Sequence, residues 1–183
     1  MSEMEFIQPD LKTTRLLLRR LRLSDANFIS THAGDLQVAR NLAVVPHPYP
    51  DGAAAEFIRA SLAGETDTLV WLIEYGEHGQ TIPAGIVSLK QSEPLTGILG
   101  YWVAPWLWGF GFATEAVSAV VERGRQFGFA SLKAGVHEGN AASARVLVKA
   151  GFSLVGEGKE YSVALQEEVH LHYFELALAG AAT

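Results

Sequence analysis

The run from Pro105 to Ala116 constrains the fold of this chain more than any other part of the sequence. It contains two glycines, Gly109 and Gly111, and it joins a strand-like stretch to a helix-like one. Glycine has no Cβ, so its backbone can come close to a ligand. The first turn of a helix offers unpaired N–H groups and a partial positive charge. The run therefore predicts an anion site, usually for phosphate, at a strand-to-helix loop.

The same run indicates how two strands pair. Residues 97–103 predict a strand before the loop, and residues 114–127 predict a helix that Gly128 ends. A second strand is expected at 131–137. A strand, a helix and a strand in this order form a βαβ crossover, so the two strands should be parallel and the connection right-handed.

The rest of the chain predicts mostly antiparallel structure. Further strands are expected at 15–22, 69–75, 84–89, 152–163 and 168–178, and further helices at 24–33, 52–63 and 140–150. Asp51 and Asn140 are the expected N-caps of the last two helices, Gly151 ends the last one, and residues 46–50 predict a loop. The fold class is therefore α/β of the mixed α+β kind, in a single domain over 1–183.

Composition excludes several kinds of site. The chain has no cysteine, which excludes disulfides and a cysteine nucleophile and fits the reducing cytoplasm where we expect it to act. Its formal net charge of −6 argues against general nucleic-acid binding and mildly favours cationic partners such as amines. The sequence shows neither a signal peptide nor a membrane span. The one basic cluster, Arg15, Arg19, Arg20 and Arg22, is expected to be a solvated strand edge.

The loop fits the common phosphate sites unequally. A P-loop needs Lys and then Ser or Thr after its second glycine, but Phe112, Ala113 and Thr114 follow here. A dinucleotide-binding loop needs a third glycine where Thr114 stands. A dinucleotide-binding loop is also unusual in the middle of a chain, after several strands. The third candidate is coenzyme A.

A family resemblance is carried by three runs, Thr14–Arg19, Trp106–Gly111 and Asn140–Phe152. The second run resembles motif A of the GNAT N-acetyltransferase superfamily, Q/R-x-x-G-x-G/A. The third resembles the N-x-x-S-x-x-x-L…K-x-G-F motif of its RimJ/RimL branch, and the first is similar to the opening strand of that branch. The resemblance implies the GNAT fold, a mostly antiparallel sheet with a central, splayed parallel pair flanked by helices. It also implies acetyl-CoA as cosubstrate.

The resemblance assigns coenzyme A to particular positions. Its pyrophosphate is expected on the backbone N–H groups of Trp108, Gly109, Phe110, Gly111, Phe112 and Ala113. Its pantetheine arm is expected to pair, like an added strand, with Tyr101, Trp102 and Val103, and an N–H near Val103 would polarise the thioester carbonyl. Trp106 and Phe110 depart from the motif, which has Gln or Arg at the first position and often a basic or polar residue at the second.

The resemblance also suggests catalytic residues. Ser143 matches the position whose hydroxyl serves this branch as general acid, and Asn140 matches a coenzyme A contact. A first-turn serine and a plain helix cap are the structural alternatives. The general base stays open between His137 and Glu138, with a solvated loop as the alternative for both. Glu115 is interpreted as structural first and catalytic second.

Two other groups of residues are not expected to form separate sites. His170 and His172 share a strand face, but two histidines alone do not make a metal site, so no metal is expected and the pair is expected to be solvated or to line the substrate site. The tryptophans are expected to pack, Trp71 and Trp102 in the core and Trp106 and Trp108 against the loop.

The predicted function is an N-acetyltransferase that passes acetyl from acetyl-CoA directly to a primary amine, without an acyl-enzyme. The first-choice acceptor is the α-amine of a protein or peptide N-terminus. The second is a small molecule, such as an amino acid, a polyamine or an antibiotic. A catalytically silent acyl-CoA-binding module is the third possibility, to which Trp106 and Phe110 lend a little support because they depart from the motif. No nucleic-acid or membrane partner is expected, and the chain is expected to be a monomer or a homodimer.

Overall fold

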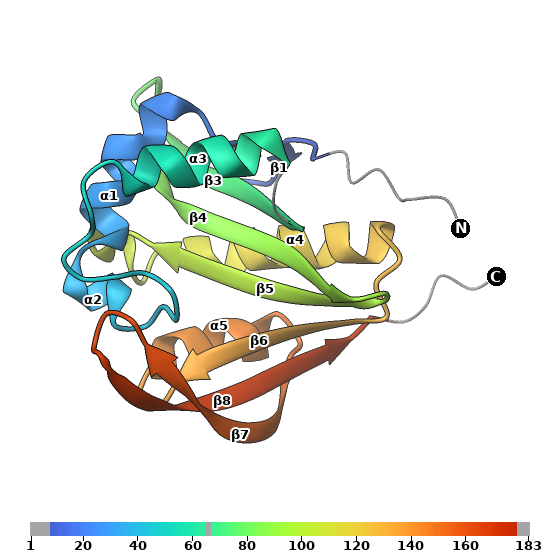
Figure 1. The fold of residues 1–183 in the computed structure, drawn as a ribbon. Helices are drawn as coiled ribbons and strands as arrows, with labels where there is room; N and C mark the ends of the chain where they lie inside the picture. Colours follow the sequence, from blue (N-terminus) through green and yellow to red (C-terminus); the bar gives the residue numbers. More distant parts are fainter. Residues whose placement is uncertain (1–7, 65–66, 179–183) are drawn as a thin grey trace.

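The structure, a computed structural model, describes residues 8–64 and 67–178. These residues form one 8-stranded sheet in the order β1-β2-β3-β4-β5-β6-β8-β7 (Figure 1). The strands are β1 (Leu11–Lys12), β2 (Leu16–Arg20), β3 (Thr68–Glu77), β4 (Gln80–Glu93), β5 (Thr96–Val103), β6 (Ser131–His137), β7 (Ser153–Ser162) and β8 (Glu167–Ala177). The helices are α1 (Ala26–Ala33), α2 (Leu36–Ala39), α3 (Ala53–Ala63), α4 (Phe112–Gln126) and α5 (Ala141–Lys149), with 3₁₀ turns η1 (Leu23–Asp25) and η2 (Pro105–Leu107).

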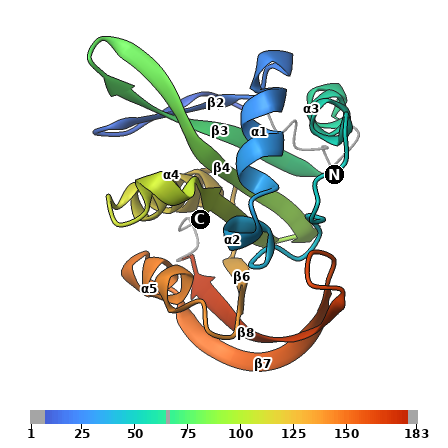
Figure 2. The same ribbon diagram turned by 90° about the vertical axis from the view of Figure 1, so that its left-hand side faces the viewer.

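Helices cover both faces of the sheet (Figures 1 and 2). On one face, α4 and α5 bury their apolar residues in the larger core, around Val117, Leu132 and Leu147. On the other face, α1 and α3 pack over a smaller core around Ile58 and Leu72. These two sides of the sheet are called the α4/α5 face and the α1/α3 face below.

The parallel pair that the βαβ unit predicts is present, and it is splayed. β5 and β6 pair in parallel at Thr96↔Ser131, Gly97↔Leu132 and Ile98↔Lys133. Beyond Ile98 they diverge, while β5 keeps its pairing with β4 and β6 keeps its pairing with β8. Each strand therefore has an unpaired edge that faces the other across the divergence (Figure 1). All other strand pairs described are antiparallel, as expected.

The helix that follows the glycine loop begins two residues earlier than predicted, at Phe112 instead of Thr114. Gly111, with φ +82°, is its N-cap. Because glycine adopts this left-handed conformation without strain, the chain turns into the helix directly after it. Gly128 has φ +78° just beyond the last turn, which confirms the predicted stop.

Of the two predicted N-caps, Asn140 is confirmed and Asp51 is not. Asn140 caps α5 by accepting a hydrogen bond from the Ser143 N–H at 3.1 Å, and Gly151 follows the helix with φ +94°, as expected. The prediction for Asp51 was wrong. The N-cap of α3 is Gly52, with φ +79° and no side-chain cap.

The elements that the sequence did not predict are short. β1, α2 and η2 contain two to four residues each, too few to show a helix or strand period. The helix expected at 24–33 is divided into η1 and α1, and residues 46–50 form no helix or strand, as predicted. Trp71 is fully buried, as expected, and its Nε1 donates to the Pro9 carbonyl at 2.8 Å.

The expectation of a solvated strand edge is wrong for Arg19, which is only 4% exposed, whereas Arg15, Arg20 and Arg22 are exposed. Its guanidinium donates to both carboxylate oxygens of Asp25 at 2.9 Å, and its Nε donates to Glu74 at 2.7 Å. Burial alone would lower the pKa of Arg19, but the bonds to the two carboxylates hold that pKa above its ordinary value. Asp25 also accepts the Arg22 N–H at 2.7 Å, at the start of η1. We call Arg19, Asp25 and Glu74 the Arg19 cluster.

Candidate active site

The glycine loop presents a row of unpaired backbone donors. Gly109 and Gly111 both adopt the left-handed conformation, with φ +85° and +82°. The first helical bond of α4 runs from the Glu115 N–H to the Gly111 carbonyl at 3.1 Å. Within the described part of the chain, no acceptor bonds to the N–H groups from Gly109 to Thr114. The Trp108 N–H is different, since it donates to the Pro105 carbonyl at 3.1 Å. The free backbone donors of the loop thus begin at Gly109, one residue after the first position expected to contact the pyrophosphate.

One edge of β5 is unpaired beyond Ile98, where the pantetheine arm is expected. The Ala104 N–H donates to the Ala84 carbonyl of β4 at 2.8 Å. Because residues of an antiparallel strand point their backbone groups to alternate sides, Tyr101 and Val103 direct theirs away from β4, toward the divergence. The Val103 carbonyl accepts a hydrogen bond from Trp108 Nε1 at 2.7 Å, so Trp108 braces the loop as predicted. The Tyr101 and Val103 N–H groups face the diverging edge of β6.

The α4/α5 face of the divergence carries a hydroxyl pair. The Tyr101 hydroxyl lies 2.7 Å from Ser143 Oγ and 3.1 Å from the Ser143 carbonyl, so it bridges from β5 to α5. Burial raises the pKa of Tyr101 to about 12, although the Ser143 bond acts in the opposite direction. Tyr101 therefore keeps its proton near neutral pH. With Asn140 holding the Ser143 N–H, these three predicted residues are brought together.

His137 faces the opposite side of the sheet. It ends β6, it is 6% exposed, and its Nδ1 lies 2.8 Å from the Arg40 carbonyl, beside α2. A carbonyl only accepts hydrogen bonds, so Nδ1 carries the proton and Nε2 of the neutral ring keeps its lone pair. Among the described residues nothing bonds to that lone pair. The alternative of a solvated loop position is wrong for His137, whereas Glu138 is exposed beyond the strand.

Side chains on the α1/α3 face form an aromatic ledge that the sequence reading missed: Phe28, His32, Trp102 and Trp106. Phe28 of α1 stacks on Trp102 of β5 at 5.8 Å and contacts His32 at 4.8 Å, and His32 lies 6.3 Å from Trp106. Trp102 is half-buried and packs against the smaller core, and Trp106 is 50% exposed. The spacing of Phe28 and His32, one helical turn apart, was the available signal.

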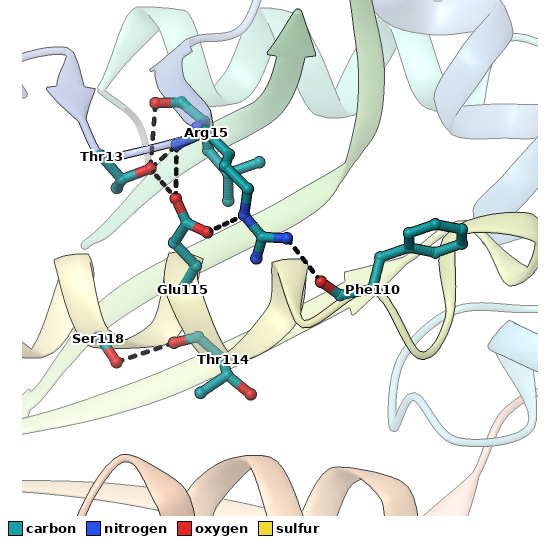
Figure 3. Close-up of polar contacts among 7 residues, drawn as sticks. Thr13, Arg15, Phe110, Thr114, Glu115 and Ser118 are labelled. Carbon is teal, nitrogen blue, oxygen red and sulfur yellow. Dashed lines mark hydrogen bonds and ion pairs between the residues drawn. The ribbon is translucent and has the colours of Figure 1, made fainter. Parts of the chain in front are cut away.

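Glu115 does not point into the divergence. Its Oε1 accepts hydrogen bonds from Thr13 Oγ1 at 2.6 Å and from the Arg15 N–H at 2.8 Å, and its Oε2 accepts one from Arg15 Nε at 2.7 Å (Figure 3). Arg15 Nη1 in turn donates to the Phe110 carbonyl at 2.8 Å. The structural interpretation of Glu115 therefore fits its contacts. We call Thr13, Arg15, Phe110 and Glu115 the Arg15 cluster.

His170 and His172 lie on β8, and their alternation puts them on one strand face, away from His137. His172 Nε2 lies 3.6 Å from Glu157. Residues 8–64 and 67–178 contain no group of three or more potential metal-ligating side chains. In the same residues, no helix has the length and apolar character needed to cross a membrane.

The fold and the loop together define the class of protein. The chain belongs to the GNAT acetyltransferase family, since the family model described as an acetyltransferase (GNAT) domain matches residues 15–153. It is 31% identical over 156 residues to a Bacillus subtilis protein named "Uncharacterized N-acetyltransferase YoaA", covering 84% of this chain and 88% of that one. The chain is an acetyl-CoA-dependent N-acetyltransferase, as its motifs predict.

Solved structures share the fold at low sequence identity. A GNAT-family acetyltransferase from Bacillus anthracis superposes with a TM-score of 0.80 at 19% identity, covering 92% of this chain and 98% of that one. RimL, described as a ribosomal alpha-N-protein acetyltransferase in complex with coenzyme A, superposes with a TM-score of 0.77 at 16% identity. That match covers 93% of this chain and 98% of RimL. At these identities the likeness shows the fold.

Proposed function

We propose that this enzyme acetylates the α-amine of a protein or peptide N-terminus, as a member of the RimJ/RimL-like branch. The observation that carries the chemistry is the placement of two proton-handling groups on opposite faces of the splayed pair. His137 lies on the α1/α3 face and the Tyr101–Ser143 pair on the α4/α5 face. An amine that enters from the first face meets a proton acceptor. A thiolate that leaves along the second meets a proton donor.

The steps follow from these positions. The neutral amine attacks the thioester carbon, the C–N bond forms, and the Val103 N–H stabilises the charge on the carbonyl oxygen. The C–S bond then breaks. His137 Nε2 takes the proton of the amine, and Ser143 Oγ gives its proton to the thiolate. The imidazolium then releases its proton to solvent, and Ser143 takes one back from solvent. No acyl-enzyme forms, because the acetyl group passes directly between the two substrates.

The acceptor class rests on different support. The Asn140–Phe152 and Thr14–Arg19 runs resemble the RimJ/RimL branch, and RimL has the same fold. The aromatic ledge offers apolar surface to the side chain next to an α-amine, with Trp106 at its exposed end. A small-molecule amine is the competing acceptor, and a silent acyl-CoA-binding module the competing role.

The test is acetyl transfer to a panel of peptides with free or blocked N-termini, amino acids, polyamines and aminoglycosides. We expect release of coenzyme A with free-terminus peptides, and mass spectrometry should place the acetyl group on the α-amine. Turnover confined to small amines would reject the peptide acceptor. Coenzyme A binding without turnover on any amine would reject catalysis.

Variants test the two proton-handling groups. We expect Ser143→Ala to lower kcat about 10²-fold with a small change in KM for acetyl-CoA. His137→Gln removes the proton acceptor for the amine and should lower kcat by a similar factor. Ser118→Ala is the matched control, because Ser118 is an exposed serine of α4 whose hydroxyl bonds only the Thr114 carbonyl at 2.8 Å. Unchanged turnover in Ser143→Ala would remove Ser143 from the mechanism.

A further inference from the structure

The glycine loop contains no basic side chain, but one reaches it from elsewhere in the chain. From Pro105 to Ala116 the only charged residue is Glu115, which is negative. Arg15, 95 positions before Phe110, donates to the Phe110 carbonyl and to Glu115. We propose that Arg15 is a positioning residue for coenzyme A, which fixes the Phe110–Gly111 peptide so that its N–H faces the phosphates. The proposal rests on the coenzyme A role of the loop.

The first argument comes from the peptide plane. In a trans peptide the C=O of one residue and the N–H of the next point in opposite directions. Arg15 Nη1 holds the Phe110 carbonyl at 2.8 Å on the side of α4 where Thr13 and Glu115 lie (Figure 3). The Gly111 N–H must then point to the other side of the loop. Gly111 tolerates a wide range of φ, which allows this peptide to rotate, and the bond from Arg15 to the Phe110 carbonyl restricts that rotation.

The second argument concerns charge. A carboxylate in the first turn of α4 stands beside the donors that would bind a pyrophosphate, and it would repel that anion. Burial alone would raise the pKa of Glu115, but the hydrogen bonds from Thr13 and Arg15 and the Arg15 charge hold that pKa below its ordinary value. Glu115 is therefore ionised at neutral pH. Arg15 Nε contacts it at 2.7 Å and offsets its charge where the anion would bind.

The third argument is the shape of the guanidinium. Arg15 uses Nε for Glu115 and Nη1 for Phe110, two donors that a planar fork holds at a fixed angle. Its carbon Cζ also lies 4.9 Å from the centre of the Phe112 ring. A lysine has the charge but a single ammonium on a flexible stem, so it cannot replace both bonds at once. The geometry thus requires arginine, and a test can separate geometry from charge.

The test measures coenzyme A binding by calorimetry, which needs no acceptor and no turnover. We expect Arg15→Ala and Arg15→Lys each to raise the Kd for coenzyme A about tenfold, the size of one lost charge-assisted hydrogen bond. Thermal unfolding of the same variants shows that they are folded. The matched control is Arg125→Ala, since Arg125 is an exposed arginine of α4 that pairs with Glu122 at 3.2 Å, far along the helix from the loop. That variant should bind coenzyme A like the wild type.

A donor without phosphates separates positioning from a general structural role. Acetyl-pantetheine carries the reacting thioester but no pyrophosphate, so its kcat/KM should be the same in Arg15→Ala and the wild type, while KM for acetyl-CoA rises and kcat changes little. An equal loss with both donors would overturn the proposal, as would full coenzyme A affinity in Arg15→Ala or Arg15→Lys. If the wild type binds no coenzyme A, the role of the loop fails together with the proposal.

Discussion

Two arginines four residues apart in the sequence, Arg15 and Arg19, have similar partners and different surroundings. Arg19 is buried beneath η1 with Asp25 and Glu74, whereas the Arg15 side chain is 47% exposed at the glycine loop. Both guanidiniums bond a carboxylate that lies far away in the sequence. This difference in burial indicates different roles: the buried Arg19 cluster stabilises the fold, and the exposed Arg15 cluster holds the glycine loop.

The physical reason is the cost of removing water from charges. In the Arg19 cluster, one cation faces two carboxylates that are almost excluded from solvent, so losing the cation leaves two buried charges unpaired. In the Arg15 cluster, water and salt screen the pair, so its contribution to stability is small. What Arg15 holds is the loop. We therefore expect substitutions in the Arg19 cluster to lower the free energy of unfolding, and substitutions in the Arg15 cluster to weaken coenzyme A binding.

The largest effect is expected from Arg19→Met. It leaves Asp25 and Glu74 buried without a cation, and the free energy of unfolding should fall by about 3–5 kcal/mol. Urea denaturation measures it, with Arg15→Met as the paired variant, which should lose less than about 1 kcal/mol. Equal losses in the two variants would contradict the comparison, because burial would then not distinguish the clusters.

The next effect is expected at Gly111, where an added Cβ would lie 3.4 Å from Arg15 Nη2. Gly111→Ala forces a non-glycine residue into φ +82°, which costs about 1–2 kcal/mol or rotates the loop out of its donor geometry. Coenzyme A affinity should fall about tenfold, measured by calorimetry.

The matched control is Gly128→Ala. Gly128 has nearly the same conformation, φ +78°, and open space around its Cβ position, but it lies at the other end of α4. It should lose similar stability and keep its coenzyme A affinity. Weaker coenzyme A binding in both variants would mean that backbone strain at either end of α4 lowers the affinity. The loss in Gly111→Ala could then not be attributed to the Arg15 cluster.

Local signals in the sequence predicted the frame of the site. The paired glycines after a strand predicted the parallel pair and the start of α4 to within two residues, because a left-handed N-cap needs glycine. Asn140 and Gly151 likewise predicted both ends of α5. The family motifs then indicated coenzyme A. Each of these signals depends on residues that are close together in the chain.

The two clusters were not predictable in this way, since their partners are far apart in the sequence. Arg19 meets Glu74 because β2 pairs with β3, and Arg15 meets Glu115 because α4 packs across β2. A run of arginines beside leucines looks like a solvated strand edge until the neighbouring strand is known. The burial of His137 was not predicted for the same reason, because its partner, the Arg40 carbonyl at the end of α2, is far away in the sequence.

A smaller effect is expected from pH, and it concerns the Arg15 cluster. The pKa of Glu115 is lowered in the folded state, so its contribution to stability is fully present above the ordinary value of 4.5 and is lost as the pH falls through the lowered pKa. The difference in unfolding free energy between the wild type and Glu115→Gln should therefore be constant from neutral pH to that value, then shrink as the pH falls further through the lowered pKa. A difference that grows on acidification would reverse the sign and contradict the assigned partners.

The smallest effect is expected from the exposed pair Glu122–Arg125 on α4, which has the same residue types as Arg15 and Glu115. Its side chains are 60% and 44% exposed, and its partners are one helical turn apart, so a double-mutant cycle should give a coupling energy below about 0.5 kcal/mol. The cycle for Arg15 and Glu115 should give a comparably small coupling in unfolding but a clear coupling in coenzyme A binding. If the Glu122–Arg125 cycle coupled to coenzyme A as strongly, the charge of α4 as a whole would explain the binding, and the particular bonds of Arg15 to Phe110 and Glu115 would not be needed.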